Sequence, residues 1–286
     1  MLMRLILSCI FCFTITSSSI AQWNIDLVDN SGQVGEYSSI DYDSSGYPHI
    51  AYYNTSDADL YYSKWNGNGW EIEAVTQHDT EFYSGQHCSL ILDTLGYPHI
   101  AYYFLNYSGY GQGELRYSYK DETGWHHQTV HSKGTRYYVG MYTSIDLFYN
   151  SDLQKDIPHI SYYDYDSYYY GTIGDLYHAK YIDSSSSWQI TRIDEAGNVG
   201  LWTSLKVDDQ ENVYISYCDA GGYDLKFAYF DGNVWSTAII DTTGNSGLYS
   251  SLTLDELGNP HISYYQIPPE GGDGRLVYTT LNNPKK

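Results

Sequence analysis

The sequence predicts an all-β protein built from five repeats of one antiparallel unit. The first observation is that the octapeptide GYPHIAYY occurs twice without change, at residues 46–53 and 96–103. The second is that looser copies follow, each a pair of short strand patterns joined by a turn. The five copies begin at Tyr37, His87, Tyr142, Trp202 and Tyr249. Internal self-similarity at a regular period is typical of repeat architectures, so the repeat decides the fold.

The turn inside these pairs carries aspartate followed by glycine or asparagine, as from Asp43 to Gly46 and from Asp255 to Gly258. Such residues suit a tight hairpin with one residue at positive φ. The third copy has a longer turn, YNSDLQKD, at residues 149–156. Pro48 is expected to begin a second strand, where a missing N–H is tolerated.

Each copy continues with a third strand, and four copies continue with a fourth. The third strands are expected from Asp59, Glu114, Asp175, Asp224 and Arg275. The fourth strands are expected to contain Trp70, Trp125, Trp188 and Trp235. The fifth copy ends without one, and a matching pattern, QWNIDLV, stands at residues 22–28 instead. There Trp23, Ile25 and Leu27 alternate with polar residues, as in an outer strand half exposed to water.

This displaced strand predicts a closed ring, because an N-terminal strand can complete the blade that the C-terminus begins. An open solenoid would need distinct capping repeats and gains nothing from splitting one. The mature length of about 265 residues (286 minus 21) divides into five units of about 53, close to the ~40 to 50 residues of a blade. We therefore expect a five-bladed β-propeller of four-stranded antiparallel blades, forming a single domain over residues 22–286.

The first residues predict export. Arg4 precedes an apolar run from Leu5 to about Ile15, and small polar residues then lead to Ala21. This order is typical of a secretory signal peptide, here residues 1–21, and the run is shorter than the ~20 apolar residues of a membrane span. We expect a secreted or periplasmic protein without membrane insertion.

Composition narrows the classes of partner. The net charge is −21 and 35 residues are tyrosine. An acidic surface repels nucleic acid phosphates and anionic membranes, so neither is expected as a partner. Tyrosine offers an apolar face and a hydroxyl on one side chain. Only Cys88 and Cys218 remain after signal removal; two cysteines are not a disulfide framework, and whether they pair is left open.

The repeat core S-[IL]-x-x-D-x-x-G-x-P-H-I-[AS]-Y-Y resembles the repeats of secreted bacterial β-propellers, which are loosely related to sialidase-type repeats. In blade number the chain is similar to tachylectin-type five-bladed lectins. The resemblance covers the mature chain and implies the architecture, whereas propellers host many unrelated functions. The sialidase motif S-x-D-x-G-x-x-W is absent from the sequence, so the resemblance does not imply that activity.

The alternating strand directions sort the loops onto two faces, and the longer loops share one of them. They span residues 76–86, 104–113, 131–140 and 164–174 and are rich in Tyr, Gly, Ser and Asn. This composition is typical of recognition surfaces carried by a rigid scaffold. The alternative is that these tyrosines pack on one another.

Two rings of side chains are expected at the mouth of the central channel. The motif G-x-aromatic-[STC]-S supplies Tyr37, His87, Tyr142, Trp202 and Tyr249. A second ring, after the second strands, is Asn54, Phe104, Asp164, Asp219 and Gln266. Aromatic faces beside polar side chains suit sugar rings, so the five aromatic residues with Asn54, Asp164 and Asp219 are the candidate ligand contacts. The alternative is an aromatic plug of the channel.

Catalysis and metal binding have weaker signals. A glycosidase needs two carboxylates about 5 to 9.5 Å apart, and nothing fixes such a pair among Glu36, Asp164, Asp166 and Asp219. No cofactor is expected. Calcium could bind at the D-x-D pairs, none of which forms an EF-hand loop: Asp41/Asp43, Asp57/Asp59 and Asp164/Asp166.

The sequence thus predicts an exported, non-catalytic binding propeller whose ligand is a glycan. The alternatives are an exported scaffold that binds an extracellular protein, and a glycoside hydrolase of sialidase or furanosidase type. The histidine of the octapeptide recurs at His99, His159 and His261, but Tyr214 replaces it in the fourth copy. Because equivalent strands of different blades diverge around a ring, we assign this histidine to the scaffold.

Overall fold

The computed structural model describes residues 24–77, 82–109, 111–166 and 173–281. These residues form strands and one short 3-10 helix, η1 (Asp183–Ser185), which confirms the all-β prediction. The strands in chain order are β1 (Val34–Tyr42), β2 (Pro48–Asn54), β3 (Asp59–Trp65), β4 (Trp70–Ala74), β5 (Phe82–Leu92), β6 (Pro98–Asn106), β7 (Gln112–Asp121), β8 (Gly124–Ser132), β9 (Tyr137–Asn150), β10 (Lys155–Asp166), β11 (Ile173–Ile182), β12 (Ser187–Asp194), β13 (Val199–Val207), β14 (Val213–Asp219), β15 (Asp224–Phe230), β16 (Trp235–Asp241), β17 (Asn245–Leu254), β18 (Pro260–Ile267) and β19 (Arg275–Thr280).

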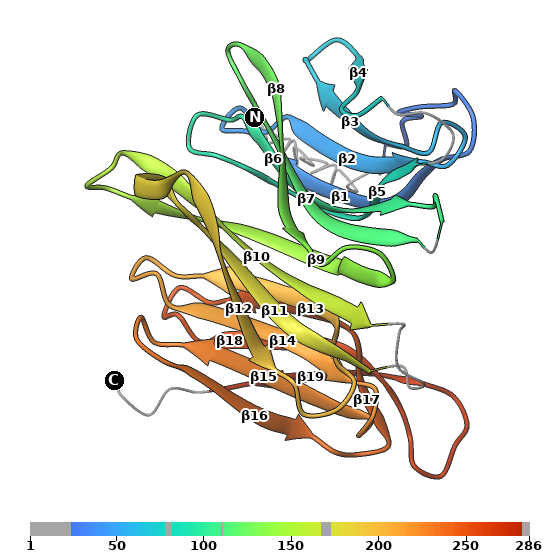
Figure 1. Ribbon diagram of the computed structural model, residues 1–286, viewed down its shortest axis with the longest axis vertical. Helices are drawn as coiled ribbons and strands as arrows, with labels where there is room; N and C mark the ends of the chain where they lie inside the picture. The colour runs from blue at the N-terminus through green and yellow to red at the C-terminus, as the bar shows by residue number, and fades with distance from the viewer. Residues whose placement is uncertain (1–23, 78–81, 110, 167–172, 282–286) are drawn as a thin grey trace, which may run out of the picture.

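The sheets follow one another in chain order, from blue to red in Figure 1. Strands β1 to β4 and β13 to β16 each form a four-stranded antiparallel sheet. Strands β5 to β8 and β9 to β12 form two further antiparallel groups of four, which one parallel pair, Gly113 with Tyr138, joins into an eight-stranded sheet. Strands β17 to β19 form a sheet of three. The predicted four-stranded unit is therefore present in four of the five repeats.

The predicted hairpin turns are confirmed. Asp43 Oδ1 accepts hydrogen bonds from the backbone N–H groups of Ser45 and Tyr47, both at 2.9 Å, and the Gly46 N–H donates to the Asp43 carbonyl. Gly46 has a φ of +78°, and so does Gly258 in the fifth repeat. A side chain is disfavoured at that φ, which explains the glycine that ends the turn.

Neighbouring sheets pack where a glycine of a first strand meets a leucine of the preceding third strand. A Cβ added at Gly140 would lie 2.6 Å from the Cα of Leu115, so no side chain fits there. The four pairs are Gly85 with Leu60, Gly140 with Leu115, Gly200 with Leu176 and Gly247 with Leu225. All four leucines are 0% exposed, and they form part of the hydrophobic clusters between the sheets.

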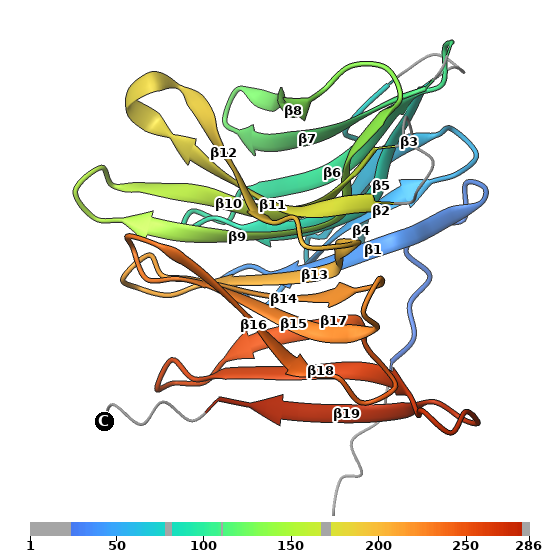
Figure 2. The same cartoon turned by 60° about the horizontal axis from the view of Figure 1, so that its bottom comes forward.

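The outer strand predicted at residues 22–28 is not observed in its described part. Residues 24–33 have no regular strand, and Ile25 and Leu27 are 94% and 74% exposed. The sheet of β17 to β19 therefore has a free edge at β19, which is the outermost strand in Figure 2. The residue that follows the segment contacts the first sheet, because Asp29 Oδ2 accepts a hydrogen bond of 2.6 Å from the hydroxyl of Tyr52 in β2.

Cys88 and Cys218 do not pair with each other, because both are buried free thiols. The predicted signal peptide lies outside the described residues. Among the residues that are described, no helix has the length and apolar character needed to cross a membrane.

Candidate functional site

The five aromatic side chains at the equivalent repeat position line one hollow. It has a volume of about 320 Å³, and the residue after each aromatic completes its lining. Adjacent ring centroids lie 4.6 Å apart from Tyr37 to His87 and from His87 to Tyr142, then 5.3 Å to Trp202 and 4.9 Å to Tyr249. The structure thus brings together all five aromatic residues that the sequence singled out.

All five aromatic residues have a left-handed backbone conformation. Their φ values are +54°, +53°, +53°, +50° and +53° for Tyr37, His87, Tyr142, Trp202 and Tyr249. The first of them stands at a bulge, where the pairing of β1 with β2 shifts register between Glu36 and Ser39. A left-handed L-residue costs roughly 1–2 kcal/mol, and bulges re-aim side chains. Strain that recurs at one place in five repeats points to a site that needs these rings in the hollow.

In four of the five repeats, the residue after the aromatic residue donates a hydrogen bond to the preceding sheet. The donors and the carbonyls that accept are Cys88 Sγ with Tyr37, Thr143 with His87, Thr203 with Tyr142 and Ser250 with Trp202. The next serine accepts a backbone N–H from the following sheet, in the pairs Ser39 with Leu90, Ser89 with Ile145, Ser144 with Leu205 and Ser204 with Leu252. Each position of the motif therefore has a distinct role. The glycine allows close packing of the sheets, the aromatic residue lines the hollow, and the two residues after it form hydrogen bonds between sheets.

The hollow is uncharged at neutral pH. No Asp, Glu, Lys or Arg of the described part of the chain lines it, and burial lowers the pKa of His87 to about 4. Burial also raises the pKa of Tyr37 and Tyr142, which keeps both hydroxyls protonated. Neither hydroxyl, nor Nε1 of Trp202, is hydrogen-bonded to another residue in the described ranges. The hollow therefore offers ring faces together with polar groups free for a neutral ligand.

The predicted polar contacts lie elsewhere. Asn54, Asp164 and Asp219 do not line the hollow and are only 1%, 4% and 8% exposed. Asn54 and Asp219 each use Oδ1 to accept the N–H groups two and three residues further on, and Asp164 forms an ion pair with Lys133. Because buried polar groups need partners, Asn54 and Asp219 bond within their own loops and Asp164 pairs with Lys133, so none of the three lines the hollow.

The other expectations for this face are met only in part. Much of the region predicted as long loops is strand, because β6 continues to Asn106 and β10 to Asp166. Parts of these loops, residues 78–81, 110 and 167–172, lie outside the described residues, as does the side chain of Asp166. Glu36 is exposed and does not line the hollow.

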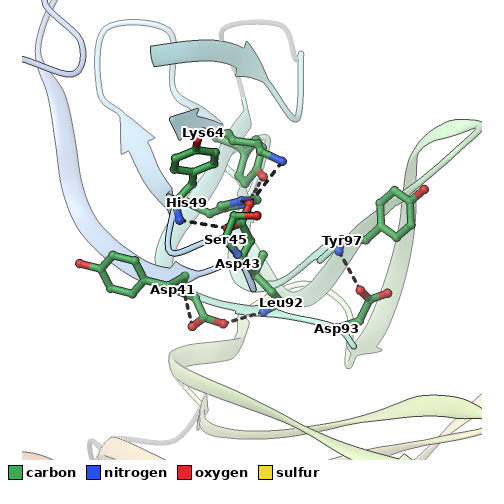
Figure 3. Close-up of polar contacts among 11 residues, drawn as sticks. Asp41, Asp43, Ser45, His49, Lys64, Leu92, Asp93 and Tyr97 are labelled. Carbon is green, nitrogen blue, oxygen red and sulfur yellow. Dashed lines mark hydrogen bonds and ion pairs between the residues drawn. The ribbon is translucent and has the colours of Figure 1, made fainter. Parts of the chain in front are cut away.

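The histidine of the octapeptide takes part in a buried relay near the hairpin turn. His49 is 0% exposed, its Nδ1 lies 2.5 Å from the Tyr62 hydroxyl, and its Nε2 lies 3.5 Å from Asp43 Oδ2. Figure 3 shows Asp43 also beside Lys64, at 3.8 Å. The arrangement recurs as Asp93, His99 and Tyr117, and as Asp255, His261 and Tyr278. It links the turn to the second and third strands, which is a scaffold role.

The described residues contain no group of three or more His, Cys, Asp and Glu side chains that could hold a metal ion. In the first D-x-D pair, Asp41 Oδ2 accepts the N–H of Leu92 at 2.8 Å (Figure 3), while Asp43 caps the turn. The two carboxylates therefore serve different partners.

A second hollow, of about 750 Å³, lies at the hairpin ends of the second and third repeats and shares no residue with the first. Sequence reasoning did not single out its tyrosines, and the longer third turn at residues 149–156 is the one signal that pointed to it. The smaller aromatic hollow remains our candidate for the main site, because its strained geometry recurs in every repeat, whereas volume alone does not define a site.

Comparison with known proteins shows similarity in structure alone. No family model and no curated protein matches the sequence. A protein of unknown function from Dyadobacter fermentans DSM 18053 aligns with a TM-score of 0.58 and 9% identity, over 85% of this chain and 75% of that one. The polysaccharide lyase Uly1 aligns with a TM-score of 0.54 and 10% identity, over 85% and 57%. An intramolecular trans-sialidase from Ruminococcus gnavus reaches a TM-score of 0.46 at 14% identity, over 82% and 50%.

This chain thus spans only about half of the lyase and trans-sialidase chains. Identities this low concern the fold alone. Successive antiparallel sheets, whose first strands present equivalent residues to one hollow, place the protein in the class of β-propellers.

Proposed function

We propose that this protein is an exported β-propeller that binds a neutral carbohydrate without cleaving it, in the hollow lined by Tyr37, His87, Tyr142, Trp202 and Tyr249. The observation that carries the proposal is the repeated left-handed conformation of these five residues around one uncharged space. Sugar rings present C–H groups that stack on aromatic faces, and their hydroxyls pair with the free polar groups of Tyr and Trp. Residues 1–21 would direct export and be removed from the mature chain.

The lining favours binding over hydrolysis. A glycosidase needs two carboxylates on opposite sides of the scissile bond, and the hollow is lined by none. Two of the acidic candidates, Asp164 and Asp219, are held by loop partners. The neutral lining also disfavours an anionic saccharide, since no cationic side chain is present to pair with it.

Trp202→Ala is expected to weaken the binding of neutral oligosaccharides at least tenfold, about 1.4 kcal/mol, because it removes the largest of the five ring faces that line the hollow. A glycan array would identify the sugar, and fluorescence titration would measure the dissociation constant. Tyr223→Ala is the matched control: Tyr223 also has a positive φ, of +63°, and is 55% exposed, but it does not line the hollow. Equal binding by wild type and Trp202→Ala, or binding of proteins alone, would contradict the proposal.

The variant Tyr249→Gly distinguishes a binding site from an aromatic plug that fills the channel. Tyr249 is 67% exposed, so its ring contributes little packing, and glycine relieves the left-handed strain. We expect binding to weaken while the free energy of unfolding rises by about 1 kcal/mol. If the five rings instead plug the channel, the variant should lower the free energy of unfolding.

We infer further that the ring is closed and five-bladed, with residues 22–28 as the outer strand beside β19. Two exposed surfaces support this inference because they match each other. A Cβ at Gly35 would meet nothing within 4 Å, although the four equivalent glycines meet a leucine. Leu276 and Tyr278 of β19 are 85% and 60% exposed, whereas their equivalents in β3, Leu60 and Tyr62, are 0% and 4% exposed. Joining Gly35 to Leu276 would repeat the contact that holds the other sheets together.

The hydrogen bond between Asp29 and Tyr52 supports the same inference. At three other boundaries, the residue at the end of a fourth strand contacts the second-strand tyrosine of the next sheet. The pairs are His131 with Tyr162, Asp194 with Tyr217 and Asp241 with Tyr264. Asp29 contacts Tyr52 in the same way at 2.6 Å, so residues 22–28 precede the first sheet as a fourth strand would.

Alanine at Gly35 tests closure. Gly46→Ala is the reference variant. Open space surrounds Gly46, so the variant should lower the free energy of unfolding by about 1 kcal/mol through its positive φ alone. Gly85→Ala adds a collision with the backbone of Leu60, so we expect a loss of roughly 2–4 kcal/mol. In a closed ring, Gly35→Ala behaves like Gly85→Ala in urea unfolding. A loss no larger than that of Gly46→Ala would rule out the inferred contact.

A further inference from the structure

The hollow of about 750 Å³ between the second and third repeats exists because the third hairpin is long. Strands β9 and β10 have 14 and 12 residues, and the turn between them spans residues 151–154. The equivalent hairpin of the first repeat pairs strands of 9 and 7 residues. The extra length forms one wall, and the end of β7 with the turn at residues 93–97 forms the other. We call this space the hairpin cleft.

Five tyrosines line the hairpin cleft, and three of them come from three different strands: Tyr119 of β7, Tyr149 of β9 and Tyr181 of β11. Tyr119 is held in place by His126, whose ring stacks on it at 4.7 Å and 18°. Tyr181 packs edge-on against Trp188 at 5.4 Å, and Tyr149 is 48% exposed. Two rings are therefore fixed by neighbours, and the third stands open at the rim.

The polar groups of the hairpin cleft are positioned but not saturated. Within the described ranges, none of the three tyrosine hydroxyls has a hydrogen-bond partner. Asp156 Oδ2 accepts both the N–H and the hydroxyl of Thr94, at 3.0 and 2.7 Å, which orients its carboxylate, and Oδ1 has no hydrogen-bond partner among the described residues. Donors and acceptors thus face the cleft from fixed positions, as a preformed binding site requires.

Charge selects the class of ligand. The lining holds five acidic residues and two lysines: Asp93, Asp121, Glu122, Asp156, Asp183, Lys120 and Lys155. Both lysines are already paired, Lys120 with Glu73 at 2.5 Å and Lys155 with Asp183 at 2.6 Å. An anionic ligand would be repelled, whereas the hydroxyls of a neutral sugar can donate to the carboxylates while its ring stacks on tyrosine.

We propose that the hairpin cleft is a second binding site, for a neutral oligosaccharide. It shares no residue with the aromatic hollow, so the inference does not rest on the function proposed for that hollow. Its volume of about 750 Å³ falls within the ~300–1,000 Å³ of small-molecule sites. Two sites at different ends of the strands would let one chain bridge two polysaccharide segments.

The test uses the full mature chain with xylo-, cello-, manno- and arabino-oligosaccharides of three to six units as probes. Titration calorimetry with a sugar that binds is expected to give two sites per chain. Tyr149→Ala and Tyr181→Ala are each expected to weaken one site at least tenfold and leave the site sensitive to Trp202→Ala unchanged. Tyr149→Ala keeps the test valid if Tyr181→Ala fails to fold, because Tyr149 lies on the surface.

Tyr107→Ala is the matched control, since Tyr107 is 66% exposed and lies outside both hollows. One site per chain, abolished by Trp202→Ala and unaffected by both cleft variants, would overturn this inference and leave the aromatic site standing. Binding lost in the cleft variants alone would support the cleft and count against the aromatic site. No binding of any probe would refute both.

Discussion

Replacing Asp194 by alanine is expected to lower the free energy of unfolding by about 3–5 kcal/mol. Asp194 and Lys226 are 7% and 6% exposed, with 2.5 Å between Oδ2 and Nζ, and the Tyr217 hydroxyl donates to the same oxygen at 2.7 Å. These hydrogen bonds lower the pKa of Asp194 against the opposing effect of burial. Without the carboxylate, an ammonium and a hydroxyl remain buried and unpaired. Urea unfolding at pH 7 measures the loss.

Two further variants show whether burial causes this effect. Glu270→Ala breaks an ion pair of similar length, 2.7 Å to Arg275, but both side chains are more than half exposed, so the loss of stability should be much smaller than that of Asp194→Ala. The double variant Asp194→Leu with Lys226→Met removes both charges and should recover much of the stability. If Asp194→Ala costs no more than Glu270→Ala, the buried pair does not stabilise the fold.

Acidification from pH 7 to pH 4.5 is expected to destabilise the protein before most carboxylates titrate. Burial lowers the pKa of His87 and of His131 to about 4, and that of His178 well below its usual value. An unfolded histidine has a pKa near 6.5, so the unfolded chain binds more protons in this range. The stabilisation from neutral histidine is complete above about pH 6.5 and is lost as the pH falls toward 4. His87, the more deeply buried of the two with a pKa of about 4, contributes on the order of 3 kcal/mol above about pH 6.5.

Urea unfolding at several pH values between 7.5 and 4.5 measures this slope. His131→Asp provides the matched control. Asp194 and Asp241 occupy the equivalent place in the next two repeats and accept the same tyrosine hydrogen bond there. The variant should keep that contact and show a shallower slope. A free energy of unfolding that is constant over this range would mean that the histidines titrate normally in the folded protein.

The strands could be predicted because their signals are local. Pro48 begins β2 as expected, the fourth strands contain their tryptophans, and the turn glycine at position 46 has the positive φ that its sequence implied. Alternation and turn chemistry act over a few residues, so one chain suffices to read them. The outer strand at residues 22–28 was different, because pairing it requires an edge some 250 residues away in the sequence, at β19 (275 minus 28 is 247).

The site could be predicted in part for the same reason. The five aromatic positions follow from the repeat, whereas the choice among the polar candidates does not. Asn54 and Asp219 look free in the sequence, yet each accepts hydrogen bonds from its own loop. The hairpin cleft needs Tyr119, Tyr149 and Tyr181 from three strands, and their spacing along the chain carries no sign that they meet.

By itself the sequence determined the repeat, its turns and the five aromatic residues, since these depend on neighbours in the chain. The tertiary structure alone decided which side chains reach a common space. The bonds that hold the sheets together connect donors and acceptors 48 to 61 residues apart. The aromatic residues beside these contacts have a left-handed conformation, which is strained for L-residues and persists only where the surrounding structure supports it. The hollow is therefore a property of the assembled sheets.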